Sequence, residues 1–228
     1  MPSYRVNESS ILLSIYDVVG QDGKLRDFIE HTGLAASAGS YDAKDKTPIF
    51  DMGPPLHGND NLSRMKISVV GVANLTDDEE RKIKTFLDRH AAEHAIFQKI
   101  GRKEILRLAP QMYCVYPHVS KLREEDDRYP RMRFSCVGFV FEAYKKARIR
   151  LLEKDTLPDL DMDLIRKAYR VQARWIDQGK IKLEDLGFEG DGPWPVMLCG
   201  YLFHAFNRTS SEIRTEPYIP YLEDQSFI

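Results

Sequence analysis

The feature that most constrains the fold of this chain is an apolar helical stripe that begins at a single cysteine. Apolar residues recur at three- and four-residue steps after Cys136, which predicts a helix with one face packed inward. The recurring positions are Val140, Ala143, Tyr144, Ala147 and Leu151. Ser135 can cap this helix, so the Cys136 thiol lies near unpaired backbone N–H groups and the positive end of the helix dipole. This position lowers the pKa of the thiol, and the N–H groups can hold an oxyanion, so Cys136 is a candidate nucleophile.

A packed, inert cysteine is the alternative interpretation of the same pattern. Cys136 falls four residues before Val140 on the apolar stripe, and free cysteine is among the most buried residue types. A cysteine of this kind counts as catalytic only if a histidine elsewhere in the chain approaches it. The helix alone leaves both interpretations open.

Length and charge set the class of protein. A chain of 228 residues makes one large domain, or one domain with an extension, and buries a sizeable core. A formal net charge of -2 gives no reason to expect nucleic acid or an anionic membrane as the main partner. The N-terminus is polar and does not resemble a signal peptide, and no stretch is long enough for an integral membrane span. We therefore expect a cytoplasmic protein; the sequence leaves its oligomeric state open.

The three cysteines, Cys114, Cys136 and Cys199, are widely spaced. Their odd number and their spacing argue against a disulfide framework and against a cysteine-rich zinc site. No cofactor is implied.

The first half of the chain favours short strands. Runs of β-branched and apolar residues predict them, and turn-forming residues separate them. The predicted strands span residues 11–19, 47–52, 64–75 and 111–116. Residues 24–30 are expected to form a short helix or an ordered loop, and residues 120–133 a charged surface loop that leads to Cys136.

A capping box marks the start of a long helix. The Thr76 hydroxyl and the Glu79 side chain can each satisfy the other residue's backbone N–H group. The helix is expected to run through Leu87 and to end before Gly101, with a further helical turn over residues 103–108.

The sequence changes character after Leu152. It predicts a helix over residues 159–176, a continuous apolar run over residues 196–206 and an irregular tail over the last twenty residues. No repeat or low-complexity linker is present. We therefore expect residues 1–152 to form the main domain and residues 153–228 to form an extension packed on it.

Segments of the first half and the cysteine helix together resemble a known family. His31-Thr-Gly-Leu34 is followed by Pro48-Ile-Phe-Asp-Met-Gly53, then by the segment from Val69 to Glu80, and last by the cysteine helix. This order is similar to that of circularly permuted papain-fold cysteine hydrolases, NlpC-type proteins of the YiiX, YaeF and lecithin retinol acyltransferase kind. In that family a histidine opens one strand in an H-x-G-aliphatic pattern, a polar residue lies on the next strand, and the cysteine comes last at the head of a helix.

The resemblance covers roughly residues 10–152 and implies a triad. By position it makes Cys136 the nucleophile, His31 the base and Asp51 the residue that orients His31. Taken without the family, His31 reads equally well as a surface turn residue, and Asp51 as a turn former before Gly53.

Other histidines are alternatives for the base. His118 follows the predicted strand over residues 111–116, and His204 lies inside the apolar run over residues 196–206. Either can serve if the permuted order is wrong. His57 reads as a loop residue, with a place in the lining of the cleft as the alternative.

A zinc site is a further alternative. His90-Ala-Ala-Glu-His94 matches the H-x-x-E-H pattern, in which two imidazoles on one helix face bind zinc and Glu93 acts as general base. A catalytic zinc needs three protein ligands, and only Glu142 and Glu153 offer a formal third.

Together these patterns predict an α+β, papain-like fold in which an antiparallel sheet packs on a cysteine-led helix. The expected activity is that of a cysteine peptidase-type hydrolase or acyltransferase, which cleaves an amide, thioester or ester bond through an acyl-enzyme. A peptide, an isopeptide or a lipid-like acyl compound is the expected substrate. Val137 stands where the family usually has serine, and Arg148 where glycine is common, so an inactive binding module on the same fold is the alternative.

Overall fold

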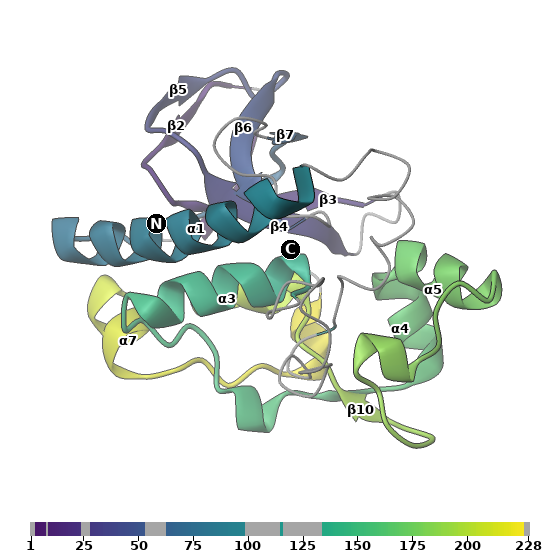
Figure 1. Ribbon diagram of the computed structural model, residues 1–228. Coiled ribbons are helices and arrows are strands. Elements are labelled where there is room, and N and C mark those ends of the chain that lie inside the picture. The colour runs from purple at the N-terminus through teal and green to yellow at the C-terminus, as the bar shows by residue number, and fades with distance from the viewer. Residues whose placement is uncertain are drawn as a thin grey trace.

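The structure is a computed structural model, and it describes residues 3–7, 9–23, 28–52, 63–98, 115 and 134–225. Within residues 91–98 it describes the backbone of a helix and not the side chains. The chain is α+β, with a large antiparallel sheet and several helices (Figure 1). None of the helices in these ranges is long and apolar enough to cross a membrane.

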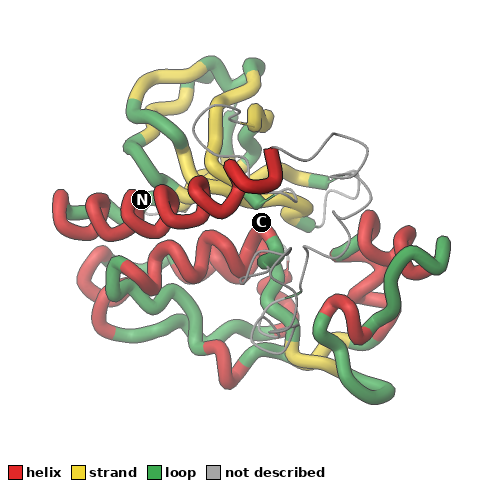
Figure 2. Tube along the Cα trace, viewed as in Figure 1, coloured by secondary structure: helices red, strands yellow, loops and turns green. Residues whose placement is uncertain are grey.

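Most strands lie in the first third of the chain, and the described remainder is mainly helical (Figure 2). The strands are β1 (Ser3–Arg5), β2 (Ile11–Leu13), β3 (Val18–Asp22), β4 (Ile29–Ala35), β5 (Gly39–Tyr41), β6 (Lys46–Asp51), β7 (Ser63–Lys66), β8 (Val69–Gly71), β9 (Asp159–Leu160) and β10 (Trp194–Pro195). The helices are α1 (Asp77–Gln98), α3 (Cys136–Lys146), α4 (Met162–Ala168), α5 (Arg170–Asp177), α6 (Cys199–Ala205) and α7 (Ser210–Thr215). Short 3-10 turns are η3 (Lys154–Thr156), η4 (Glu184–Leu186) and η5 (Leu222–Gln225).

The main sheet has six strands in the order β1-β8-β3-β4-β6-β7, and every pair is antiparallel. Strand β4 is central, with β3 on one side and β6 on the other. Two small sheets, β2 with β5 and β9 with β10, complete the strands. The predicted α+β class, with an antiparallel sheet next to the cysteine helix, is confirmed, since α3 packs on β4 and β6.

Three of the secondary-structure predictions need correction. Residues 11–19 do not form one strand, because a turn separates β2 from β3. In this turn Tyr16 has a φ of 64°, and the Asp17 carboxylate accepts a hydrogen bond from the Ser14 N–H at 2.8 Å. Residues 64–75 form the two strands β7 and β8, because the Ser68 N–H bonds to the Gly20 carbonyl at the point where the chain turns. The first residues of β4 lie in the segment predicted as a helix or loop over 24–30.

Helix α1 begins at the predicted capping box. The Thr76 N–H donates to Glu79 at 2.8 Å, and the Glu79 N–H donates to the Thr76 hydroxyl at 3.4 Å. Helices α1 and α3 run side by side beneath the sheet (Figure 1), joined by contacts such as that between the rings of Phe86 and Phe139 at 5.6 Å. The capping box therefore fixes the start of α1, which covers one side of α3.

Helix α3 begins at Cys136, as predicted, with Ser135 as its N-cap. The Ser135 hydroxyl accepts a hydrogen bond from the Gly138 N–H at 3.1 Å. All members of the predicted apolar stripe are buried. The helix ends earlier than the stripe, because Ala147 is its C-cap and Arg148 follows with a φ of 68°.

Residues 153–228 share the hydrophobic core of the sheet and α3. Most of the apolar run over residues 196–206 becomes the buried helix α6, which packs on β4, β8 and α3. The helix predicted over residues 159–176 divides at Tyr169 into α4 and α5, where the Tyr169 hydroxyl donates to the Met197 carbonyl at 2.8 Å. The tail contains α7 and η5, so its prediction as irregular is wrong in part.

Several predictions fall outside the described residues. These are the helical turn over 103–108, the strand over 111–116 apart from Val115, the charged loop over 120–133 and the side chains of His57 and His118. Val115 is described, and its N–H donates to the Leu186 carbonyl at 3.0 Å.

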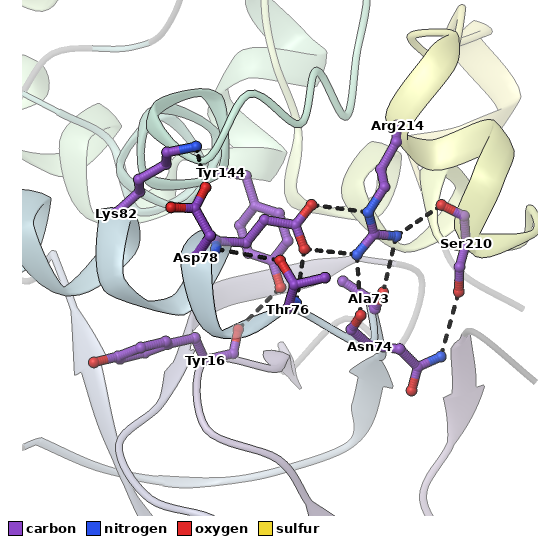
Figure 3. Close-up of polar contacts among 10 residues, drawn as sticks. Tyr16, Ala73, Asn74, Thr76, Asp78, Lys82, Tyr144, Ser210 and Arg214 are labelled. Carbon is purple, nitrogen blue, oxygen red and sulfur yellow. Dashed lines mark hydrogen bonds and ion pairs between the residues drawn. The ribbon is translucent and has the colours of Figure 1, made fainter.

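A polar joint ties the C-terminal segment to the start of α1 (Figure 3). Arg214 of α7 donates two parallel hydrogen bonds to the Glu79 carboxylate, at 2.8 and 2.7 Å. The same guanidinium donates to the carbonyls of Asn74 at 3.0 Å and Ser210 at 2.7 Å. Such bidentate, charge-assisted bonds are among the stronger polar contacts in proteins.

We predict that Arg214→Ala lowers the free energy of unfolding by about 1.5–3 kcal/mol, because Glu79 and two backbone carbonyls lose a charged donor. Arg214→Lys should recover only part, since an ammonium cannot form the two parallel bonds. Urea denaturation of the variants measures both changes. Arg150→Ala is the matched control: its ion pair with Glu153 is largely solvent-exposed, so its loss should cost less than about 1 kcal/mol. If the hydrogen bonds of Arg214 contributed nothing to stability, the Arg214 variants would be as stable as Arg150→Ala.

Candidate active site

Two of the predicted site residues lie on neighbouring strands, and the sheet register brings them together. Gly33 of β4 is directly opposite Asp51 of β6. His31 lies two residues before Gly33, so all three positions share one face of the sheet, with His31 diagonal to Asp51. A β-carbon at Gly33 would lie 3.2 Å from the Asp51 β-carbon and 2.7 Å from the Phe50 carbonyl oxygen. The glycine of the H-x-G pattern therefore leaves the space through which the carboxylate reaches the imidazole.

The contact between His31 and Asp51 is a short hydrogen bond. The distance from His31 Nε2 to Asp51 Oδ2 is 2.6 Å. The Asp51 side chain is 7% exposed and that of His31 31% exposed, so the carboxylate is shielded while the histidine side chain is partly exposed. The bond to Asp51 fixes the orientation of the ring. It leaves Nδ1 as the nitrogen that can serve a second partner.

That second partner is Cys136. The His31 side chain and the Thr32 backbone N–H lie near enough to the Cys136 sulfur to lower its pKa. The cysteine is only 5% exposed, because it begins α3, which packs on β4. Residues 31, 51 and 136 thus meet at one point although they are far apart in the sequence.

A second cysteine reaches the same sulfur. The distance from Cys136 Sγ to Cys199 Sγ is 3.6 Å, and both cysteines are buried and free. Cys199 is the first residue of α6, in the segment predicted as an extension. Neither Cys199 nor the Thr32 N–H was among the predicted site residues. The odd number of cysteines gave only a weak indication that Cys199 belongs to the site, and no sequence motif links Cys199 to Cys136.

The charges of the site are coupled. Partial burial of His31 favours its neutral form, but its hydrogen bonds to Asp51 and Cys136 and their negative charges outweigh this and raise its pKa to about 10. The hydrogen bond from Cys199 opposes the effect of burial on Cys136 and, with the bond and positive charge of His31, holds the pKa of Cys136 well below its ordinary value of 9.0. Both pKa shifts favour a thiolate beside an imidazolium, which is the form in which cysteine is nucleophilic.

The alternative base His204 lies elsewhere. Its ring stacks on Tyr218, and its Nδ1 is 3.8 Å from an oxygen of Asp224. The imidazole that acts on the pKa of Cys136 is that of His31. The other alternative base, His118, lies outside the described residues, so its role stays untested.

The predicted zinc ligands are described only in part. His90 is buried, with its ring against Phe86 at 4.4 Å and Phe134 at 5.4 Å, whereas the side chains of Glu93 and His94 are not described. Glu142 pairs with Lys145 at 3.0 Å, and Glu153 pairs with Arg150 at 2.9 Å. Among the side chains that the structure does describe, no group of three histidine, cysteine or acidic residues is arranged to hold a metal ion.

The first prediction for this site concerns the pH dependence of Cys136 alkylation. Because its pKa is depressed, the thiolate is lost only as the pH falls through the lowered value, whereas a free cysteine is about a few per cent thiolate at pH 7. The alkylation rate with iodoacetamide, followed by mass spectrometry of the Cys136 peptide, should therefore keep its plateau below neutral pH. His31→Ala should move the midpoint upward by about 1–3 units, because the neighbouring positive charge is gone. His204→Ala should leave the midpoint in place. A wild-type midpoint near 9.0 would contradict the ion pair.

The second prediction concerns His31 itself. Its raised pKa means that the ring loses its proton only as the pH rises through about 10, and the stability that the charged ring contributes is complete below pH 6.5 and lost toward pH 10. In Asp51→Asn, which removes the charge and keeps the shape, the pKa should fall toward 6.5. Titration of the ring nitrogens by NMR measures both values. An unchanged titration in the variant would show that Asp51 does not hold the charge.

Comparison with known proteins assigns no family to this chain. No protein-family model, curated protein or solved structure matches it. What this group of residues does is therefore inferred from its own geometry and electrostatics.

Proposed function

We propose that the protein is a cysteine hydrolase or acyltransferase of the permuted papain-like kind, with Cys136 as nucleophile, His31 as acid and base, and Asp51 as the group that orients His31. The observation that carries this proposal is the convergence of three distant residues: Asp51 bonds to His31 at 2.6 Å, and Cys136 lies near enough to His31 for each of the two to shift the other's pKa. Nucleophile, base and orienting group in hydrogen-bonded sequence are what covalent acyl transfer requires.

The acylation step follows from the charges at neutral pH. The Cys136 thiolate attacks the carbonyl carbon of an amide, thioester or ester, and the carbonyl oxygen becomes an oxyanion. The backbone N–H groups of Cys136 and Val137 lie in the first turn of α3, where the helix supplies no acceptor, and can donate to that oxyanion. The bond to the leaving group then breaks, and His31 gives its proton to the departing amine, thiol or alcohol. The products are an acyl-enzyme on Cys136 and a neutral His31.

Deacylation returns the site to its starting state. Neutral His31 takes a proton from water, or from an acceptor amine or alcohol, and the resulting nucleophile attacks the acyl carbon. The sulfur leaves as a thiolate, beside an imidazolium again, and the acyl group departs as an acid or a new ester or amide. Asp51 stabilises the imidazolium at both ends of the cycle and keeps Nε2 occupied.

The order of the elements supports the permuted assignment. His31 lies on β4, Asp51 on β6 and Cys136 at the head of the later helix α3, which is the order in the family that the sequence resembles. Arg148 stands where that family commonly has glycine, and its φ of 68° lies in the left-handed region that glycine adopts most easily. The backbone conformation thus fits the family pattern although the residue departs from it.

The substrate class is an acyl compound: a peptide, an isopeptide or a lipid-like amide or ester. The acyl part must reach the sulfur of a residue that is only 5% exposed. The partial exposure of the neighbouring His31 side chain supports an approach from that side.

We predict a covalent acyl-enzyme. The protein is incubated with an activated acyl ester, an acyl thioester and a peptide amide, and intact-mass and peptide mass spectrometry locate the adduct. Wild-type protein should carry one acyl group on Cys136, and Cys136→Ala none. His31→Ala should slow turnover by about 10²–10⁴-fold through the loss of acid–base catalysis.

Cys114→Ala is the matched control, and it should form the same adduct as wild type. If no donor acylates Cys136 while the thiolate is present, the chain is instead a binding module that has kept the site and lost the reaction.

A further inference from the structure

The contact between the two buried sulfurs is the feature of the site that the proposed triad does not use. Cys136 Sγ and Cys199 Sγ are 3.6 Å apart, much farther than the about 2.05 Å of a disulfide bond. The distance suits a hydrogen bond between a thiol and a second sulfur. Cys136 and Cys199 are 5% and 7% exposed, so water does not compete strongly for that bond.

We infer that Cys199 is a positioning residue of the active site: its S–H donates a hydrogen bond to the Cys136 sulfur and holds that sulfur beside the His31 ring. This inference rests on the role proposed above for Cys136. It extends that role to a residue supplied by the C-terminal segment.

The direction of the bond follows from the neighbours of Cys136. The His31 ring and the Thr32 N–H also approach this sulfur, and both are donors. A sulfur that already faces two donors serves as the acceptor of the third contact, and a thiolate accepts better than a thiol. Two thiolates at 3.6 Å would repel one another, so only one of the two sulfurs ionises.

The two cysteines are unequal in a way that fits this direction. The bond to Cys136, burial and the negative charge of Cys136 raise the pKa of Cys199 well above its ordinary value, so Cys199 keeps its proton. The pKa of Cys136 moves the opposite way. Cys136 has His31 beside it, and this asymmetry assigns the charge to Cys136.

The position of Cys199 is set by close packing around the first turn of α6. Helix α6 packs on β4 and α3, the elements that carry His31 and Cys136. Gly200 follows Cys199, and a β-carbon there would lie 2.3 Å from the Gln225 carbonyl oxygen and 2.6 Å from that of Asp224. The backbone of η5 therefore lies directly against the first turn of α6, where Cys199 begins the helix. The segment after residue 152 thus completes the site.

The test measures the ionisation of Cys136 directly, without substrate. The thiolate absorbance in the ultraviolet is titrated under a phosphine reductant, and the curve of the matching Cys136→Ala protein is subtracted. Four backgrounds are compared: wild type, Cys199→Ala, Cys199→Val and Cys199→Ser. Thermal melting checks that each is folded, and valine provides an apolar side chain of similar size if alanine leaves an unstable cavity.

The Cys136 midpoint should rise by about one to two pH units in Cys199→Ala and Cys199→Val, because a bond to a charged acceptor is lost. Cys199→Ser, whose hydroxyl can donate, should keep most of the wild-type value. Midpoints in the alanine and valine variants within about 0.3 units of wild type would overturn the inference, as would a serine variant that titrates like alanine. The acyl-enzyme measurement is separate. A raised Cys136 midpoint in Cys199→Ala, without any acylation of the wild-type protein, would support this hydrogen bond and rule out the proposed enzymatic activity.

Discussion

The site depends on the interaction between the negatively charged Asp51 carboxylate and the His31 imidazole. The 2.6 Å bond to Asp51 raises the pKa of the imidazole, and the positive charge of His31 in turn helps to hold the pKa of Cys136 below its ordinary value. Each charged partner is costly to bury alone, because a lone charge in a low-dielectric interior loses its hydration. Grouping the three side chains distributes this cost, and it places Cys136 at the start of a helix.

The fold supplies the rigid supports that this group of side chains needs. Strands β4 and β6 hold His31 and Asp51 in register, and Gly33 leaves the gap between them. Helix α3 fixes the position of Cys136 through its Ser135 cap and its buried apolar stripe, and α1 packs on one side of this helix. Helix α6 adds Cys199 against the same sulfur. A catalytic group held by elements with such packing is more precisely placed than one on a loop.

The parts of the site that the sequence predicted are those with a local signature. The helix at Cys136, its Ser135 cap and the capping box at Thr76 follow from the periodicity and hydrogen-bonding capacity of neighbouring residues, and the structure agrees with them. The pairing of His31 with Asp51 came from the resemblance and not from spacing. Periodicity alone cannot say which strands are neighbours.

The errors in the sequence analysis also have physical causes. Residues 11–19 are rich in β-branched and apolar residues, yet the left-handed conformation of Tyr16 interrupts the strand. The helix over residues 159–176 divides where Tyr169 reaches the Met197 carbonyl, a partner that is remote in sequence. Cys199 was missed for the same reason. Its apolar surroundings are those of any core cysteine, and only the packing of α6 on β4 and α3 brings it to Cys136.

The most direct test of the account is the location of the hydrogen atoms by neutron diffraction from deuterium-exchanged crystals at neutral pH. The account predicts deuterium on both Nδ1 and Nε2 of His31, none on Cys136 Sγ, and one on Cys199 Sγ directed at Cys136. A single deuterium on the His31 ring, together with one on Cys136 Sγ, would show a neutral pair and would contradict the ion pair on which the proposed chemistry depends.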